Sequence, residues 1–195
     1  MQVKVVIINL DSVLMKADVK SFEEKLRSIL GIDGDLKSLI AEASTRALDE
    51  EKVKAIDEAL REVELKTAEE AEIDQRDLEA ICTLKAIGVK LALVTMRCRG
   101  STEKAIEKMG LKGLFDVVIT RDEEPEKAHQ ISRACSSLGL RVDEALYVGF
   151  SRADAIAGVQ AGCLVATPHR VLQALGQTIR VNSLSELLDT FKFTS

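Results

Sequence analysis

Residues 3–14, which read VKVVIINLDSVL, decide the first element of the fold. The run from Val3 to Ile8 is almost entirely β-branched, and continuous apolarity of this kind is typical of a strand covered on both faces. Acidic Asp11 interrupts the apolar stretch, and no small-residue cleavage site follows it. The segment therefore indicates a buried strand rather than a signal peptide.

Further apolar runs of strand length follow. We predict strands over Leu91–Thr95, Phe115–Thr120, Ala145–Gly149, Cys163–Thr167 and Thr178–Val181. From Leu91 onward, helical segments separate the strands, including Ser101–Met109, Pro125–Leu138 and Arg152–Ala161, and Ser183 with Glu186 has the spacing of a capping box before a last helix. Strands that alternate with helices imply right-handed crossovers and a doubly wound, mostly parallel α/β sheet.

Residues 16–74 break this alternation and contain no convincing strand. Ser21 and Glu24 have capping-box spacing. Apolar residues then recur at helical spacing, in three stripes: Phe22, Leu26, Ile29 and Leu30; Leu36, Leu39, Ile40 and Ala43; Val53, Ile56, Leu60 and Val63. We predict a helical cap over 16–74 and an α/β core over 1–15 and 75–195, with Leu78–Ile87 as the returning helix. At the ligand-binding edge of the sheet, the cap is either a lid or a structural appendage.

The composition is that of a soluble globular protein. The chain has 195 residues, of which 46% are apolar and 30% charged, and its net charge is -5. The negative balance and the absence of a basic stretch argue against nucleic-acid binding. No apolar run reaches the roughly 18 residues that span a bilayer, so we expect a cytoplasmic protein without a membrane segment.

The four cysteines show no CxxC spacing. Cys82 and Cys135 lie in apolar helical patterns and Cys163 in a strand-like run, so all three are expected to be buried free thiols. Cys98 stands between Arg97 and Arg99. Neighbouring cations lower the pKa of a thiol, so this position is a hint of a reactive cysteine. His129 and His169 have no partner residues at ligand spacing, so they do not predict a metal site.

Polar residues gather where the predicted strands end. Asn9 and Asp11 follow the first strand, and Thr95 and Arg97 end the second. Asp154 comes soon after the fourth, and Lys127 opens the helix that precedes it. Polar groups at the carboxyl ends of parallel strands are what a phosphate or metal site requires.

These stretches together resemble the haloacid dehalogenase superfamily, whose members are mostly magnesium-dependent phosphatases. Its first signature, DxDGTL, reads NLDSVL from Asn9 to Leu14, and LALVT resembles the second. The fourth, GDxxxD with a helix ending in AG, resembles LYVGFSRADAIAGVQAG at 146–162. The tail at 164–188 resembles the closing strands and helix, and the insert resembles the helical cap class, so the resemblance covers essentially the whole chain.

The resemblance assigns the attacking aspartate to position 9, where this chain has Asn9. A neutral amide is a poor nucleophile, and loss of a covalent nucleophile costs on the order of 10⁴ to 10⁶ in rate. The family's general acid–base aspartate is retained as Asp11. An engineered substitution that lets the protein capture its substrate would explain Asn9 alone. The first acid of the fourth signature is also replaced, by Phe150, and two independent losses favour natural degeneration of the site.

By the same resemblance, Mg²⁺ would be held by position 9, by the main chain of Asp11 and by position 150. An amide and a phenyl ring are poor substitutes for two carboxylates, because Mg²⁺ prefers hard oxygen ligands. We therefore expect Mg²⁺ binding to be weak or absent. Asp11 and Asp154 are the remaining candidate metal ligands, Asp154 acting through water.

Three residues are candidates for holding a phosphoryl group: Thr95, Arg97 and Lys127. The family's lysine precedes a proline, whereas here Asp122, Glu123 and Glu124 occupy those positions. Lys127 is therefore either the phosphate lysine or an exposed residue of the first helical turn. Thr95 is either a phosphate contact or an ordinary residue at a strand end.

Three functions remain open. The first expectation is a catalytically impaired pseudophosphatase that binds a phosphorylated small molecule or a protein partner. The alternative is a weakly active Mg²⁺-dependent phosphatase or hydrolase, in which Asp11 or recruited water does the chemistry. The third is a structural interaction protein that uses its helical insert. The sequence identifies neither substrate nor oligomeric state.

Overall fold

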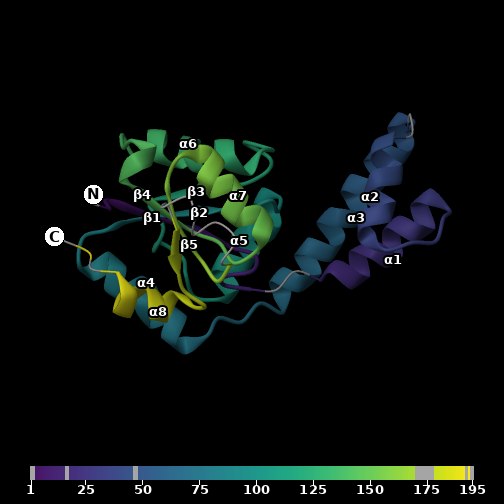
Figure 1. Cartoon of the computed structure of the whole chain (residues 1–195). Coiled ribbons are helices and arrows are strands. Elements are labelled where there is room, and N and C mark those ends of the chain that lie inside the picture. Colours follow the sequence, from purple (N-terminus) through teal and green to yellow (C-terminus); the bar gives the residue numbers. More distant parts are fainter. Residues whose placement is uncertain (1–2, 16–17, 46–47, 170–177, 192, 194–195) are drawn as a thin grey trace.

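A six-stranded parallel sheet forms the centre of the main lobe (Figure 1). The computed structural model describes residues 3–15, 18–45, 48–169, 178–191 and 193. The strands are β1 (Val5–Asn9), β2 (Lys90–Val94), β3 (Val117–Ile119), β4 (Ala145–Val148), β5 (Leu164–Thr167) and β6 (Thr178–Arg180), in the spatial order β3-β2-β1-β4-β5-β6. All five strand pairings are parallel. The predicted doubly wound α/β fold is confirmed.

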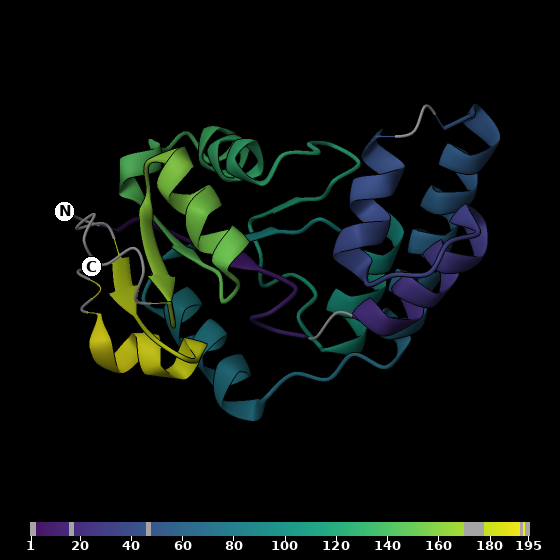
Figure 2. The same ribbon diagram turned by 45° about the vertical axis from the view of Figure 1, so that its right-hand side comes forward.

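The sheet is covered by helices on both faces (Figure 2). They are α4 (Gln75–Ala86), α5 (Arg99–Lys108) and α8 (Leu184–Thr190) on one face, and α6 (Lys127–Ser137) and α7 (Arg152–Ala161) on the other. In β1, Val6 and Ile8 point to the first layer, and Val5 and Ile7 to the second. Both layers bury apolar side chains, which explains why β1 is continuously apolar.

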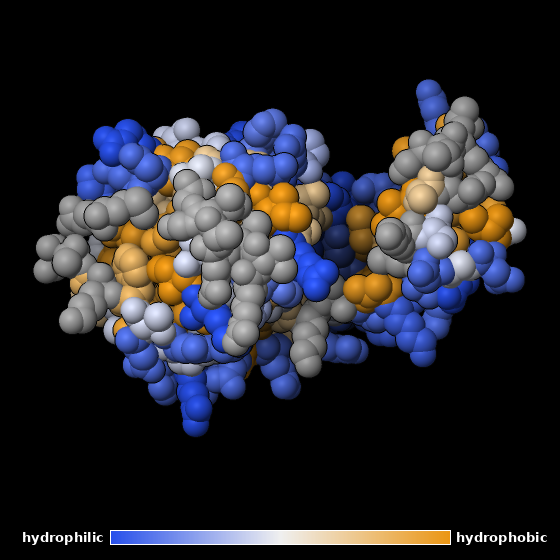
Figure 3. All heavy atoms as spheres, viewed as in Figure 1, coloured by the Kyte–Doolittle hydropathy of each residue, from blue (hydrophilic) through white to orange (hydrophobic). Residues whose placement is uncertain are grey.

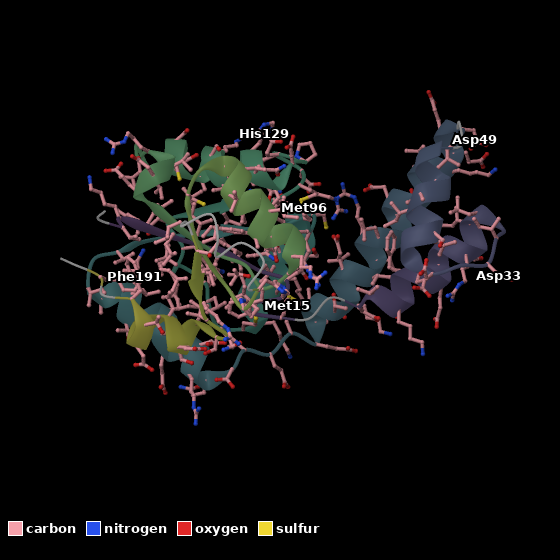
Figure 4. The ribbon with its side chains drawn as sticks, in the orientation of Figure 1. Met15, Asp33, Asp49, Met96, His129 and Phe191 are labelled. Carbon is pink, nitrogen blue, oxygen red and sulfur yellow. The ribbon has the colours of Figure 1, made fainter. Side chains whose placement is uncertain are left out.

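The insert forms a separate helical lobe beside the sheet. It contains α1 (Val19–Leu30), α2 (Leu36–Thr45) and α3 (Glu50–Glu69), and α3 extends from the far end of this lobe, near Asp49, back to the sheet (Figures 1 and 4). Leu26, Leu30 and Leu39 form its small core. The predicted stripes are only partly correct, because Ile40 and Val53 are 48% and 54% exposed. Three helices cannot bury every apolar position.

Several helix starts differ from the sequence predictions, including those of α4 and α5, which begin at Gln75 and Arg99. The Ser21–Glu24 capping box is wrong: Asp18 is the N-cap of α1, and its carboxylate accepts from the main-chain N of Ser21. Pro125 precedes α6, which starts at Lys127, rather than lying in its first turn. In α8 the predicted cap is present, because the hydroxyl of Ser183 accepts from the N–H of Glu186.

The cysteines follow the prediction except for one. Cys98, Cys135 and Cys163 are buried, but Cys82 is exposed on α4. Burial raises the pKa of Cys135 to about 11 and that of Cys163 to about 12. The hint of a reactive thiol at Cys98 does not fit its environment, since the residue is only 3% exposed.

Some predicted features lie outside the described residues. These are the tail at 170–177, the start of the insert at 16–17 and the side chain of Leu36. Within the described parts of the chain, no helix combines the length and the apolarity needed to cross a bilayer.

Candidate functional site

The candidate site lies at the carboxyl ends of β1, β2 and β4. The strand order reverses between β1 and β4, because β2 and β3 lie on one side of β1 and β4, β5 and β6 lie on the other. Such a switch point leaves a crevice at the strand tips, where open α/β sheets bind ligands. The fold therefore places the predicted site residues at one edge of the sheet.

Asn9, the last residue of β1, is only 2% exposed. Its amide nitrogen donates to the main-chain oxygen of Asp11, and lies 3.2 Å from Oδ2 of Asp154 and 3.4 Å from Oγ of Ser12. Its Oδ1 is buried without a hydrogen-bond partner. The reverse amide orientation would place Oδ1 against a carboxylate and a carbonyl, so the donor orientation is the favourable one.

Asp154 is buried on α7, and both of its oxygens accept hydrogen bonds. Nζ of Lys127 lies 2.5 Å from Oδ1, while the Ser12 hydroxyl and the Ser151 N–H each lie 3.0 Å from Oδ2. Burial alone would raise the pKa of Asp154, but the Lys127 ammonium and the hydrogen bonds outweigh it and lower that pKa. The carboxylate is therefore charged and already neutralised.

Lys127 is the first residue of α6, as a first-turn residue should be. The interpretation of Lys127 as an exposed helix residue is nevertheless wrong, because its side chain is only 19% exposed and pairs with Asp154. The structure thus places this cation at the site.

Asp11 is held by residues that follow β2. Nε of Arg97 lies 2.9 Å from Oδ1 of Asp11, and the hydroxyl of Thr95 lies 3.2 Å from Oδ2. The Thr95 hydroxyl also accepts from the N–H of Arg97, at 3.1 Å. Thr95 is therefore more than an ordinary strand-end residue, and a water or ligand next to Asp11 would meet an oriented carboxylate.

The six predicted residues thus form one hydrogen-bonded network. Lys127 pairs with Asp154, Asp154 accepts from Asn9, and Asn9 donates to the main chain of Asp11. The Asp11 carboxylate in turn contacts Thr95 and Arg97. The structure thus brings together the six residues that the sequence analysis singled out.

Ser12 and Gly149 were not singled out as site residues, yet both shape the network. Ser12 has a φ of 71° where the family signature has glycine, a left-handed conformation that is uncommon for other residues. Its hydroxyl donates to Asp154 and accepts from the N–H of Phe150. A Cβ on Gly149 would lie 2.4 Å from Cβ of Asp154, so only glycine allows this packing. The departure from glycine at position 12 was the signal available in the sequence.

Phe150 offers no ligand atom to the site. It is partly exposed, and its side chain packs against the apolar cluster on the α4, α5 and α8 face of the sheet. Its main-chain oxygen lies 2.9 Å from Nε2 of His169. The ring therefore serves packing where the family signature has an acid.

These residues do not fit a divalent cation in this arrangement. The main-chain oxygen of Asp11 and Oδ2 of Asp154 both accept from the amide of Asn9, and Lys127 occupies the other carboxylate oxygen. Among the residues that the structure describes, no group of three or more His, Cys, Asp or Glu side chains could hold a metal ion. The amide nitrogen of Asn9 and the ammonium of Lys127 thus occupy the positions beside Asp154 that a metal cation would need.

Helix α3 of the insert is joined to the site by buried polar groups. Arg97, which binds Asp11, also donates from Nη1 to the main-chain oxygen of Glu64 and to the hydroxyl of Thr67, at 2.9 and 2.8 Å. The Glu64 carboxylate accepts from the N–H of Cys98, the N-cap residue of α5, at 2.9 Å, and from Nη1 of Arg121. The sequence carried no signal for Glu64 or Arg121, because their partners are distant along the chain.

A cavity of about 310 Å³ lies between α1, α3 and the tips of the sheet. It reaches Asp11 and Arg97 on one side and apolar residues of the insert on the other. Figure 3 shows the surface hollowed between the two lobes. Space for a small ligand therefore adjoins the retained acid.

The model of a family described as haloacid dehalogenase-like hydrolase matches residues 4–167. The "Putative pyrophosphatase PpaX" of Clostridium perfringens is 25% identical over 96% of both chains. A phosphoglycolate phosphatase of Chromobacterium violaceum is 30% identical over 56% of this chain and 52% of its own length. The crystal structure of a hydrolase from Pseudomonas syringae has a TM-score of 0.79 at 16% identity, covering 95% of this chain and 96% of that one, which is a likeness of fold.

Proposed function

Because the chain belongs to the haloacid dehalogenase-like hydrolase family, we propose that it is a slow hydrolase of a small phosphorylated molecule that works without a covalent intermediate. Relatives named as phosphatases and pyrophosphatases support a hydrolase more than the impaired pseudophosphatase that the sequence analysis placed first. Catalytic impairment has no support from these relatives.

The observation that carries the proposal is the orientation of Asp11 by Arg97 and Thr95. A carboxylate fixed by two hydrogen bonds beside an open cavity can take a proton from water as that water attacks phosphorus and the ester P–O bond breaks. The departing oxygen then takes up a proton, so that inorganic phosphate and an alcohol are released. Asn9 cannot supply the attacking group, since its amide carries no full negative charge. General-base help of this kind contributes about 10² to 10⁴ in rate, so turnover is expected to be slow.

Lys127, Thr95 and Arg97 are the proposed contacts for the phosphoryl oxygens. Lys127 now pairs with Asp154 at 2.5 Å, so a bound phosphate would share this ammonium. Mg²⁺ is typical of the family and would supply charge stabilisation when bound, but we propose that it binds this chain weakly, because the main-chain oxygen of Asp11 and the Asp154 carboxylate already accept hydrogen bonds from Asn9 and Lys127. Asp154 and the main chain of Asp11 are its only proposed contacts.

The test is phosphate release from an aryl phosphate, with and without Mg²⁺, in the native chain and in Asp11→Asn. Slow release that Asp11→Asn abolishes, while binding of inorganic phosphate persists, supports the proposal. Release that is unaffected by Asp11→Asn would contradict it.

A pure binding protein is the second candidate, and the neutral Asn9 at the tip of β1 favours it. For that candidate, the native chain binds inorganic phosphate or vanadate in a thermal-shift experiment but releases no phosphate above the rate in water. A role as an interaction protein with a protein partner would show neither anion binding nor turnover.

A further inference from the structure

The cavity beside Asp11 differs in character between its two sides. Towards the insert it is lined by the apolar residues Val19, Phe22, Leu60 and Val63, and Met96 adds another from the sheet lobe. Figure 4 shows Met96 at the edge of the sheet lobe that faces the insert. Val19 and Met96 are 49% and 39% exposed, which is a large apolar exposure for residues facing a cavity.

The charged groups that also line this cavity already have partners. Arg97 donates to Asp11, to the main chain of Glu64 and to Thr67. The Glu64 carboxylate accepts from Cys98 N and from Arg121. Apart from the proposed contact of Arg97 with the phosphoryl oxygens, little hydrogen-bonding capacity is left on these groups for a ligand.

Two remaining polar groups are also engaged. The Asp18 carboxylate caps α1 through Ser21 N, at 3.0 Å. Nη2 of Arg121 makes no hydrogen bond, but it lies 3.6 Å from Oδ1 of Asp57, so its charge is balanced. A hydroxyl-rich ligand would therefore lose its hydration here and gain few hydrogen bonds.

From this lining we infer that the ligand is a phosphate monoester of a short aliphatic group, which lies against Phe22, Leu60, Val63 and Met96 while the phosphate is near Asp11. The inference rests on the proposed function and adds the class of substrate to it. At about 30 Å³ for each water-sized group, a cavity of about 310 Å³ holds roughly ten non-hydrogen atoms. A phosphate with four or five carbons has this size.

The experiment measures dissociation constants by calorimetry for inorganic phosphate, for methyl to butyl phosphate, for 2-phosphoglycolate and for pyrophosphate. Each buried methylene is worth up to about fourfold in affinity. We expect affinity to rise by about two- to fourfold per methylene, and butyl phosphate to bind at least about tenfold more tightly than 2-phosphoglycolate or pyrophosphate.

A matched pair of variants on α3 locates the effect. Leu60→Asn puts an amide into the cavity and should reduce the gain per methylene to less than about 1.5-fold. Leu65→Asn makes the same change at a residue that is 43% exposed and does not line the cavity, so it should keep the native dependence on chain length.

The native ligand series needs no variant, so the test holds even if Leu60→Asn does not fold. Equal affinity along the alkyl series, or tighter binding of 2-phosphoglycolate or pyrophosphate than of butyl phosphate, would overturn the aliphatic ligand and leave the proposed function standing. Absence of binding by every phosphorylated ligand would overturn the proposed function itself.

Discussion

The side-chain amide of Asn9 donates to the carboxylate of Asp154 across a distance of 3.2 Å. These residues lie 145 positions apart in the chain and come together because β1 and β4 are neighbours in the sheet. The second oxygen of Asp154 is held by Lys127 at 2.5 Å. The neutral amide of Asn9, which stands at the position of the family's nucleophile, and the ammonium of Lys127 thus both stabilise the buried carboxylate of Asp154.

Asn9→Asp should restore little phosphatase activity. The new carboxylate would face Asp154 directly, and two like charges near 4 Å repel by up to about 4 kcal/mol at intermediate dielectric, part of which Lys127 offsets. Asn9→Asp with Phe150→Asp should restore Mg²⁺-dependent activity, because it returns both missing anions. Phosphate release with and without Mg²⁺ is the measurement, and Phe150→Asp alone is the control. Full activity of the single Asn9→Asp variant would refute this view of the metal site.

Replacing Arg97 by methionine should lower both stability and turnover. The Arg97 side chain is 4% exposed, and its removal takes the cation from Asp11 and one donor each from the main-chain oxygen of Glu64 and the hydroxyl of Thr67. Breaking a buried pair costs about 3–5 kcal/mol, and the 24% exposure of the Asp11 side chain places the expected loss at or below the lower limit.

Urea unfolding of Arg97→Met should be compared with that of Arg141→Met, which removes an arginine whose side chain is 74% exposed and pairs with Asp143, two residues away. Arg141→Met should unfold at the same midpoint urea concentration as the native chain. Equal stability of the two variants would mean that Arg97 does not join the insert to the core.

Gly149→Ala should lower the stability of the folded protein, because the site has no room for an added methyl group. The added methyl would lie 2.4 Å from Cβ of Asp154, and overpacking of this kind costs about 1–3 kcal/mol. Gly100→Ala is the matched control, because its Cβ would meet nothing within 4 Å and alanine favours the helix by up to about 1 kcal/mol. The two variants should shift the melting temperature in opposite directions, and a shift of the same sign in both would contradict the packing.

The architecture was readable from the sequence because it depends on local pattern. Continuous apolar runs predicted the strands, and Gly162 predicted the end of α7. In the structure this glycine has the left-handed φ of 88° that ends the helix. The sequence analysis could single out the candidate site residues because each stands near a strand tip or the start of a helix. Glu64, Arg121 and the burial of Lys127 were missed, because they depend on contacts between segments 27 to 57 residues apart. Asp18 displaced Ser21 as the cap because only the geometry shows which side chain reaches the free N–H group.

Thiol labelling tests the layer structure independently of activity. At pH 8, Cys82 should react in the folded protein, since it is exposed, whereas Cys135 and Cys163 should not. Burial raises their pKa values to about 11 and about 12, so almost no thiolate is present at that pH, and the reactive fraction should rise only as the pH approaches those values. Peptide mass spectrometry after brief alkylation identifies the labelled residues. Rapid labelling of Cys163 in the native state would contradict the packing of β5.

The most direct measurement is the intact mass of the native chain, quenched in acid while it turns over an aryl phosphate. Hydrolysis by water with Asp11 as the base predicts release of phosphate with no gain of a phosphoryl group on the protein, and the Asn9→Asp, Phe150→Asp variant should show that gain. A phosphorylated native chain would contradict the account.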